Sequence, residues 1–156
     1  GGPSGRCLAA HELERRVGFE DVYTAGALMV FDQSRDMFEI AHGFAHFFAH
    51  ESCGFCTPCR VGTTLVLQRM DTLAAGLGSP FDQAALDDLD TLMQGTTHCG
   101  LGASSTHALR DTLERFGPAY DRRMQRPTVT PGVDLNAELA PGRRVTGRDD
   151  REEVVI

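Results

Sequence analysis

Three closely spaced cysteines limit the possible folds of this chain more than any other feature. Cys53, Cys56 and Cys59 are separated from one another by two residues, and Cys99 stands far downstream. A chain of 156 residues has room for about one hydrophobic core. In a chain that looks cytosolic, cysteines spaced this closely indicate metal or redox chemistry rather than disulfides, because the cytosol keeps thiols reduced. The fold must therefore hold the three sulfurs of this loop near one another, where they can bind a metal or take part in redox chemistry.

The division of the cysteines into three plus one favours iron and sulfur. Three thiolates of one loop can hold three corners of a 4Fe-4S cluster and leave the fourth iron to a remote thiolate. Cys99 is the candidate for that position, and His98 is its rival. A structural zinc site more often uses two Cys/His pairs. Two alternatives stay open: a zinc-stabilised interaction module without redox function, and thiol–disulfide exchange on Cys53 and Cys56, for which a surrounding βαβ pattern is missing.

Residues beside the cysteines suit a cluster. Three glycines would let backbone amides approach sulfur: Gly54, Gly100 and Gly102. Pro58 would stiffen the loop. We expect Arg60 to offset cluster charge or to meet an acidic partner surface, rather than to be an ordinary solvated arginine. Cys7 is far from the others in the chain, and we interpret it as a buried thiol without a role in the cluster.

Apolar residues at helical spacing predict a mainly α-helical cluster domain over residues 34–124. We expect roughly four helices, at about 34–50, 60–76, 79–95 and 104–124, the last with a break at Gly117–Pro118. The first helix begins at Ser34 or Asp36, either of which can cap it. Its apolar row is expected to be core: Met37, Ile40, Phe44, Phe47 and Phe48.

Segments of different character flank this domain. Residues 1–33 are expected to be a partial β-containing remnant, in which the apolar run Ala27–Phe31 forms a buried strand. Residues 125–156 contain several prolines and few large apolar residues, and end in a charged run. We expect an extended or disordered tail there, or one ordered on a partner.

A row of histidines on the first expected helix is the other candidate site. His42, His46 and His50 stand four residues apart, with Glu39 on the same face, which is a geometry able to bind a divalent metal. A polar or partner-facing helix face explains the row equally simply, and we favour that interpretation because no catalytic His–Glu motif accompanies it.

Composition excludes some functions. The net charge of −7 argues against general nucleic-acid binding, which needs a basic surface. No apolar run approaches the roughly 20 residues that span a bilayer. The first residues show neither an initiator methionine nor a signal-peptide pattern. We expect a cytoplasmic chain, bound at most peripherally to a membrane complex, that is a fragment or a separately encoded module.

Two segments resemble a known family. Residues 51–62, which contain the three-cysteine loop, and Cys99–Gly102 resemble the C-terminal part of the flavin-containing NADH-oxidising subunit of respiratory complex I. The diaphorase subunit of soluble NAD-reducing hydrogenases and the matching subunit of NAD-dependent formate dehydrogenases belong to the same family. Gly1–Gly5 also looks like part of the ubiquitin-like domain that precedes the cluster domain there.

The resemblance implies a function and its partners. It assigns one 4Fe-4S cluster to Cys53, Cys56, Cys59 and Cys99. It further implies electron relay between flavin mononucleotide (FMN), reduced by NADH, and downstream iron–sulfur subunits of the thioredoxin-like 2Fe-2S and ferredoxin-like types. The family's FMN and NADH site lies in an N-terminal domain, and this sequence contains no dinucleotide-binding fingerprint. We therefore expect that this chain alone does not oxidise NADH.

Overall fold

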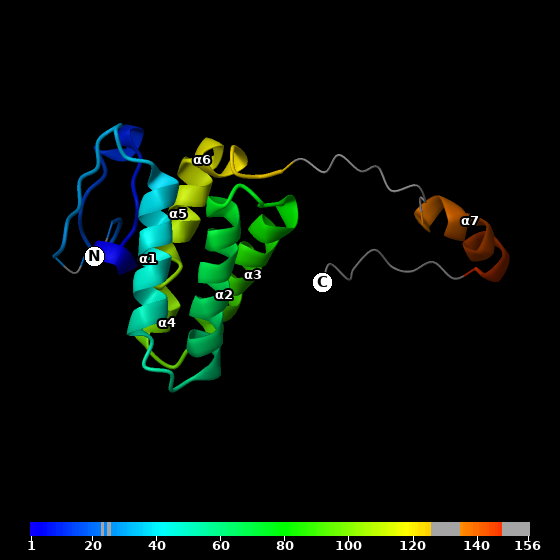
Figure 1. Ribbon diagram of the computed structural model, residues 1–156. Helices are drawn as coiled ribbons and strands as arrows, with labels where there is room; N and C mark the ends of the chain where they lie inside the picture. Colours follow the sequence, from blue (N-terminus) through cyan, green and yellow to red (C-terminus); the bar gives the residue numbers. More distant parts are fainter. Residues whose placement is uncertain (23, 25, 126–134, 148–156) are drawn as a thin grey trace. The chain divides into compact units, whose positions relative to one another are not determined.

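A computed structural model of the chain describes residues 1–22, 24, 26–125 and 135–147. The chain divides into two compact units, residues 1–126 and 127–156, and each is described by itself. The first unit is a helical bundle, with α1 (Met37–Glu51), α2 (Thr57–Ala74), α3 (Pro80–Thr96), α4 (Gly100–Ser104), α5 (His107–Arg115) and α6 (Gly117–Asp121) (Figure 1). Two single 3-10 turns precede the bundle, η1 (Gly2–Ser4) and η2 (Ala10–Glu12). The expectation of a mainly α-helical domain is confirmed.

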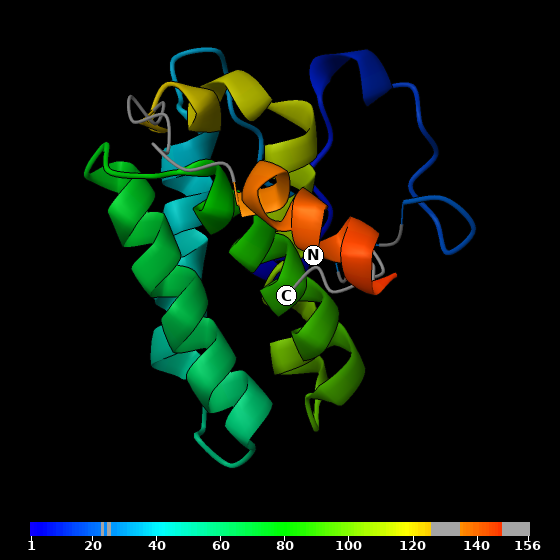
Figure 2. The same cartoon turned by 90° about the vertical axis from the view of Figure 1, so that its right-hand side faces the viewer.

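The helices α1 and α2 form an antiparallel hairpin around the cysteine loop (Figure 2). Asp36 caps α1, where its carboxylate accepts a hydrogen bond of 2.9 Å from the amide of Phe38. At the far end of α2 the chain turns at Gly76, whose φ of +70° is readily adopted only by glycine. Both signals can be recognised in the sequence and mark the open end of the hairpin, and residues 52–56 join the two helices at its other end.

The helix α3 packs closely against α2. It begins with a capping box, in which Asp82 accepts hydrogen bonds from the amide and hydroxyl of Ser79, and Pro80 occupies the first turn. Near its end Met93 is fully buried, and a Cβ added at Gly62 of α2 would lie 2.6 Å from the sulfur of Met93. The two helices approach so closely only because position 62 has no side chain.

The last part of the bundle shows the expected break. The helix α5 ends at Arg115, and α6 begins at Gly117 with Pro118 in its first turn. The short helix α4, which the sequence did not predict, precedes α5. Tyr120 of α6 is buried, and its hydroxyl lies 2.7 Å from the hydroxyl of Thr112 on α5, so the broken pair still contributes to the core.

The core draws on every long helix of the bundle, through Phe38, Ala41, Ala45, Val66, Met70, Leu73, Leu86, Met93, Leu109 and Tyr120. On α1 the expected core row is only partly right. Phe48 is buried, but Phe47 is 46% exposed, and the residues facing the other helices include Phe38 and Ala41. A helix with apolar residues around much of its circumference does not reveal from sequence alone which stripe meets the core.

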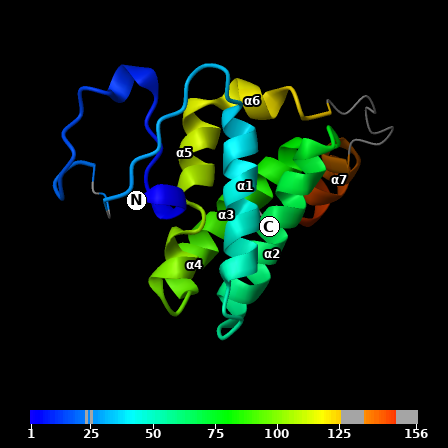
Figure 3. The same ribbon diagram turned by 60° about the vertical axis from the view of Figure 1, so that its left-hand side comes forward.

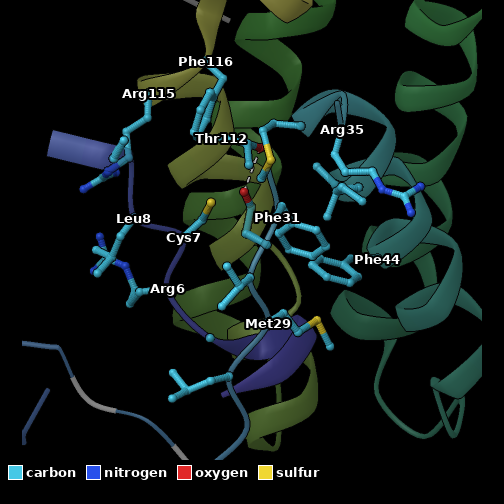
Figure 4. A pocket seen from close by; sticks show the side chains of 18 of the residues that line it. Arg6, Cys7, Leu8, Met29, Phe31, Arg35, Phe44, Thr112, Arg115 and Phe116 are labelled. Atoms are coloured by element: carbon cyan, nitrogen blue, oxygen red, sulfur yellow. Dashed lines mark hydrogen bonds between the residues drawn. The ribbon is translucent and has the colours of Figure 1, made fainter. Parts of the chain in front are cut away.

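Ile40 and Phe44 face a different space. They line a cavity of about 900 Å³ between α1, α5 and the chain that precedes α1, here called the N-terminal segment (residues 1–36). Met29, Phe31 and Phe116 line the same cavity (Figure 4). The apolar circumference of α1 therefore serves two surfaces, the core on one side and this cavity on the other.

The expected β remnant is not found. Among the described residues of 1–33 there is no strand, only an isolated bridge between Val17 and Val22, and residues 27–32 are irregular. Leu28 is 77% exposed and Val30 94%, so the apolar run is not a buried strand. A strand is stable when a neighbouring strand pairs its backbone groups, and no strand pairs with this segment among the described residues.

A buried carboxylate holds the N-terminal segment on α5. Asp111 has no exposed side-chain surface and accepts hydrogen bonds of 2.7 and 2.8 Å from the guanidinium of Arg6 and of 2.8 Å from the amide of Cys7. A few residues further on, Glu12 pairs with Arg115 at 2.5 Å. The segment is thus fixed by charge-assisted contacts rather than by a sheet.

In the second unit, α7 (Leu135–Thr146) is a helix where an extended or disordered tail was expected. Helix-favouring residues such as Ala137, Leu139 and Ala140, and Glu138 in the first turn, oppose the effect of Pro141 inside the helix. The rest of the expected tail, apart from residues 125 and 147, lies outside the described residues.

Replacing Asp111 by alanine should destabilise the protein by about 3 kcal/mol, because it removes the acceptor for Arg6 and for the Cys7 amide at a fully buried position. Urea unfolding followed by circular dichroism measures the change. The exposed Asp88 provides the matched control, and Asp88→Ala should stay within about 0.5 kcal/mol of the wild type. Equal effects of the two substitutions would contradict the role given to Asp111.

Candidate metal centre

Three of the four candidate ligands lie at starts of helices. Cys56 is the N-cap residue of α2, Cys59 lies in the first turn of that helix, and Cys99 is the N-cap residue of α4. Cys53 lies in the loop at the tip of the hairpin. Cys59 is buried and Cys56 half-buried, whereas Cys53 and Cys99 are exposed. The set therefore combines an anchored inner side with an open outer side.

The turn before Cys99 lies against the cysteine loop. The rings of Phe55 and His98 are 5.4 Å apart, and the backbone amide of His98 lowers the pKa of the nearby Cys56 thiol. The loop between α1 and α2 and the start of α4 lie at the same end of the bundle (Figure 3). Residues about 40 positions apart in the chain are thereby neighbours, with Cys99 directly after the contact.

Backbone amides favour the thiolate form of Cys56. The amide of His98 has the largest effect, the amide of Cys59 follows, and the charge of Arg60 adds a smaller one; together they lower the pKa of the Cys56 thiol. A metal binds the thiolate and not the thiol, so the same contacts that lower the pKa favour metal binding.

Ser52 supports the innermost cysteine and was not singled out in the sequence. Its hydroxyl lies 3.3 Å from the sulfur of Cys59 and 3.4 Å from the amide of Gly54. Ser52 also ends α1 as its C-cap residue, so it joins the helix end, the loop and a candidate ligand. A serine next to a cysteine carries no signal that would have identified this role.

Gly54 and Arg60 shape the cysteine loop, and the amide of Gly54 donates to the hydroxyl of Ser52 rather than to a sulfur. Gly54 has a φ of +75°, which an L side chain rarely adopts. The guanidinium of Arg60 donates to the carbonyl of Gly54 and, over 3.3 Å, to the hydroxyl of Thr57. Arg60 therefore bridges the loop and the start of α2, and its positive charge acts on the thiol of Cys56.

A close approach also holds the turn that carries Cys99. A Cβ added at Gly102 would lie 2.6 Å from Cγ2 of Thr97, so α4 folds back tightly on the end of α3. The hydroxyl of Thr97 donates to the carbonyl of Met93 over 2.7 Å. These contacts fix the short segment between the two helices.

In the described part of the chain, the cysteine sulfurs are not grouped as closely as the ligands of one zinc ion would be. Among the described residues, no three cysteine sulfurs lie within 4.8 Å of one another. Four thiolates around one zinc ion would be separated by about 3.8 Å, as follows from a Zn–S bond of about 2.3 Å in a tetrahedron. Backbone amides that donate to sulfur are also the surroundings expected for the ligands of an iron–sulfur cluster.

The other singled-out residues lie elsewhere. Cys7 is half-buried rather than fully buried and lines the cavity under the N-terminal segment, where burial and the nearby Asp111 raise its pKa (Figure 4). In the histidine row, His50 contacts Glu51, and Glu39 pairs with Arg123. His42 and His46 meet a residue of α2, as described below.

Comparison with known proteins identifies the family. Residues 39–123 match the NADH-ubiquinone oxidoreductase-F iron-sulfur binding region, a family whose cofactor is a 4Fe-4S cluster. The chain belongs to this family. The matched range runs from α1 to just beyond α6 and includes all four candidate cysteines.

Two individual relatives support the same family. The alpha subunit of the NAD-reducing hydrogenase HoxS of Cupriavidus necator is 35% identical, over 98% of this chain and 26% of that subunit. The mitochondrial 51 kDa subunit of the NADH-ubiquinone oxidoreductase of Neurospora crassa is 33% identical, over 64% of this chain and 20% of that protein. The chain thus spans between a fifth and about a quarter of these relatives' length.

A solved structure shares the fold. A chain of an NAD+-reducing nickel–iron hydrogenase in the H2-reduced state matches with a TM-score of 0.77 and 42% identity, over 99% of this chain and 28% of that one. None of the helices in the described ranges is both long enough and apolar enough to span a membrane.

The conformation of Gly54 can be tested against a second glycine. Gly54→Ala should lower the free energy of unfolding by about 1 to 2 kcal/mol, because the positive φ is strained for alanine while the added Cβ meets only ordinary contacts. Gly43 lies within α1 with open space around it, so Gly43→Ala should raise stability by about 0.5 to 1 kcal/mol. Urea unfolding of both variants, with equal cluster content, checks the opposite signs.

Proposed function

We propose that this chain holds one 4Fe-4S cluster on Cys53, Cys56, Cys59 and Cys99 and relays single electrons through it. The observation that carries the proposal is the contact between the turn before Cys99 and the three-cysteine loop, where the rings of Phe55 and His98 lie 5.4 Å apart. The family match to an iron–sulfur binding region supports the type of cofactor. When bound, the cluster supplies a one-electron redox couple.

The protein's own residues would hold the cluster and set its reduction potential. Cys59, buried in the first turn of α2 and contacted by Ser52, is the anchored ligand, while Cys53 and Cys99 stand on the exposed side. Amides directed at sulfur and the charge of Arg60 stabilise the more negative, reduced state, and thereby raise the reduction potential. The exposed side offers a short route for electrons to a partner.

The assembly around the chain follows from its relatives, which are subunits of NAD-linked oxidoreductases. In our proposal, electrons pass between an FMN and NADH site outside the described fold and iron–sulfur subunits of the thioredoxin-like 2Fe-2S and ferredoxin-like types. The chain then acts as one stage of an NADH dehydrogenase or hydrogenase diaphorase and does not oxidise NADH alone. A cytoplasmic location suits this role.

The competing function is a zinc-stabilised interaction module. It predicts a colourless protein with zinc and no acid-labile sulfide, whereas the cluster predicts a brown protein with about four irons and four sulfides per chain. Anaerobic purification, metal and sulfide analysis, and electron paramagnetic resonance after dithionite reduction distinguish the two. Zinc without sulfide would overturn the relay proposal.

The fourth ligand can be tested directly. Cys99→Ser should abolish the cluster or convert it to a three-iron form, because one iron loses its thiolate. Cys7→Ser is the matched control and should retain the full iron content, since Cys7 lines the cavity under the N-terminal segment. His98→Ala should also retain it, because the group of His98 that lowers the pKa of Cys56 is its backbone amide, which alanine keeps. Iron and sulfide per chain are the measurement.

Two results would contradict this assignment. Equal iron content in Cys99→Ser and Cys7→Ser would remove Cys99 from the ligand set. Loss of one iron in His98→Ala, with Cys99→Ser unaffected, would make the histidine the fourth ligand.

A further inference from the structure

A second group of metal-ligating side chains lies on the α1–α2 hairpin, away from the cysteine loop. The ligand atoms of His42, His46 and Asp71 all lie within 4.8 Å of one another, and among the described residues no other three such side chains come so close. Asp71 stands twelve residues after Cys59 on α2, a rise of about 18 Å along the helix axis. The group is therefore separate from the candidate cluster site.

The geometry of the two histidines suits one ion. His42 and His46 are four residues apart on α1, so both side chains project from one face, and their rings are 5.4 Å apart. The same spacing places two histidines on one zinc ion in helical metal sites. The ring of His42 also packs against Phe38, with centroids 5.9 Å apart, which restricts its rotation.

The third donor comes from the other helix. Nε2 of His42 lies 2.6 Å from Oδ1 of Asp71, and the side chain of His42 is only 17% exposed. Asp71 is 53% exposed, which leaves room for an ion and for water on the outer side. Ligands on one zinc ion are about 3.4 Å apart for bonds of about 2.05 Å, so small side-chain rotations complete the site.

We propose that His42, His46 and Asp71 bind one Zn2+ ion, which ties α1 to α2. Two imidazoles and one carboxylate suit a borderline transition ion, whereas Mg2+ requires oxygen ligands in an octahedron. Three protein ligands leave a position for water. Because α1 and α2 carry the cysteine loop at their other end, the ion would stiffen the hairpin that presents the loop.

The other polar residues of the row are engaged elsewhere. Glu39 pairs with Arg123 at 2.7 Å, and His50 contacts Glu51 at 3.0 Å, with its side chain 85% exposed. His50 therefore provides a matched control on the same helix, of the same residue type, in the next step of the row.

The test uses the full chain with its cluster reconstituted, so that the cysteines are occupied, and Zn2+ as the probe. Isothermal titration and zinc analysis should give one Zn2+ per chain in the wild type and in His50→Ala. His46→Ala and Asp71→Asn should weaken binding at least tenfold, with iron content and helix content unchanged. Mg2+ should produce no binding heat at the same concentrations.

X-ray absorption at the zinc edge identifies the donors. Nitrogen and oxygen neighbours at about 2.0 Å support the site, whereas sulfur at about 2.3 Å would place zinc on the cysteines and overturn it. Wild-type affinity in His46→Ala, or no zinc binding in the wild type, would also overturn it and would leave the contact of His42 with Asp71 as a plain hydrogen bond. Because iron and sulfide are measured separately, failure here is distinguishable from failure of the proposed cluster.

Discussion

The close packing of α2 on α3 at Gly62 and Met93 is the contact on which the geometry of the candidate cluster site depends. Gly62 stands one turn after Cys59, and Met93 stands near the end of the helix that leads to Cys99. Because a Cβ at position 62 would lie 2.6 Å from the Met93 sulfur, the two helices could not keep this separation with a larger residue at position 62. This packing brings the turn at His98 onto the cysteine loop.

The site shows how a small helical domain can favour the thiolate form of cysteines in a loop without burying the whole loop. One cysteine is anchored in the first turn of a helix, one receives backbone amides, and two remain exposed. Amides and a neighbouring guanidinium favour negative charge at sulfur without placing a second full charge inside the core. The proposed electron relay would need this combination, because a cluster must be held firmly and still lie close to a partner.

The N-terminal segment is held on the bundle mainly by ion pairs and hydrogen bonds rather than by apolar packing. Apolar packing there is incomplete, since Leu28 and Val30 are exposed and a cavity separates the segment from α1. Its position depends on the buried carboxylate of Asp111 and on the pair of Glu12 with Arg115. Charge-assisted contacts of this kind fix geometry more than they add stability, because burying the charges offsets much of the attraction.

Features that local chemistry controls could be predicted from the amino-acid sequence alone. The spacing of the cysteines indicated a cluster site, Asp36 and Ser79 marked helix starts, and Gly76 and Gly117–Pro118 marked a stop and a break. Each of these depends on residues within one or two turns of one another. The folded chain was needed to show which stripe of α1 is buried, that residues 27–31 form no strand, and that Asp71 joins His42 and His46. These features depend on partners far away in the chain, whose positions follow from the packing of whole helices and not from any pattern that a short segment contains.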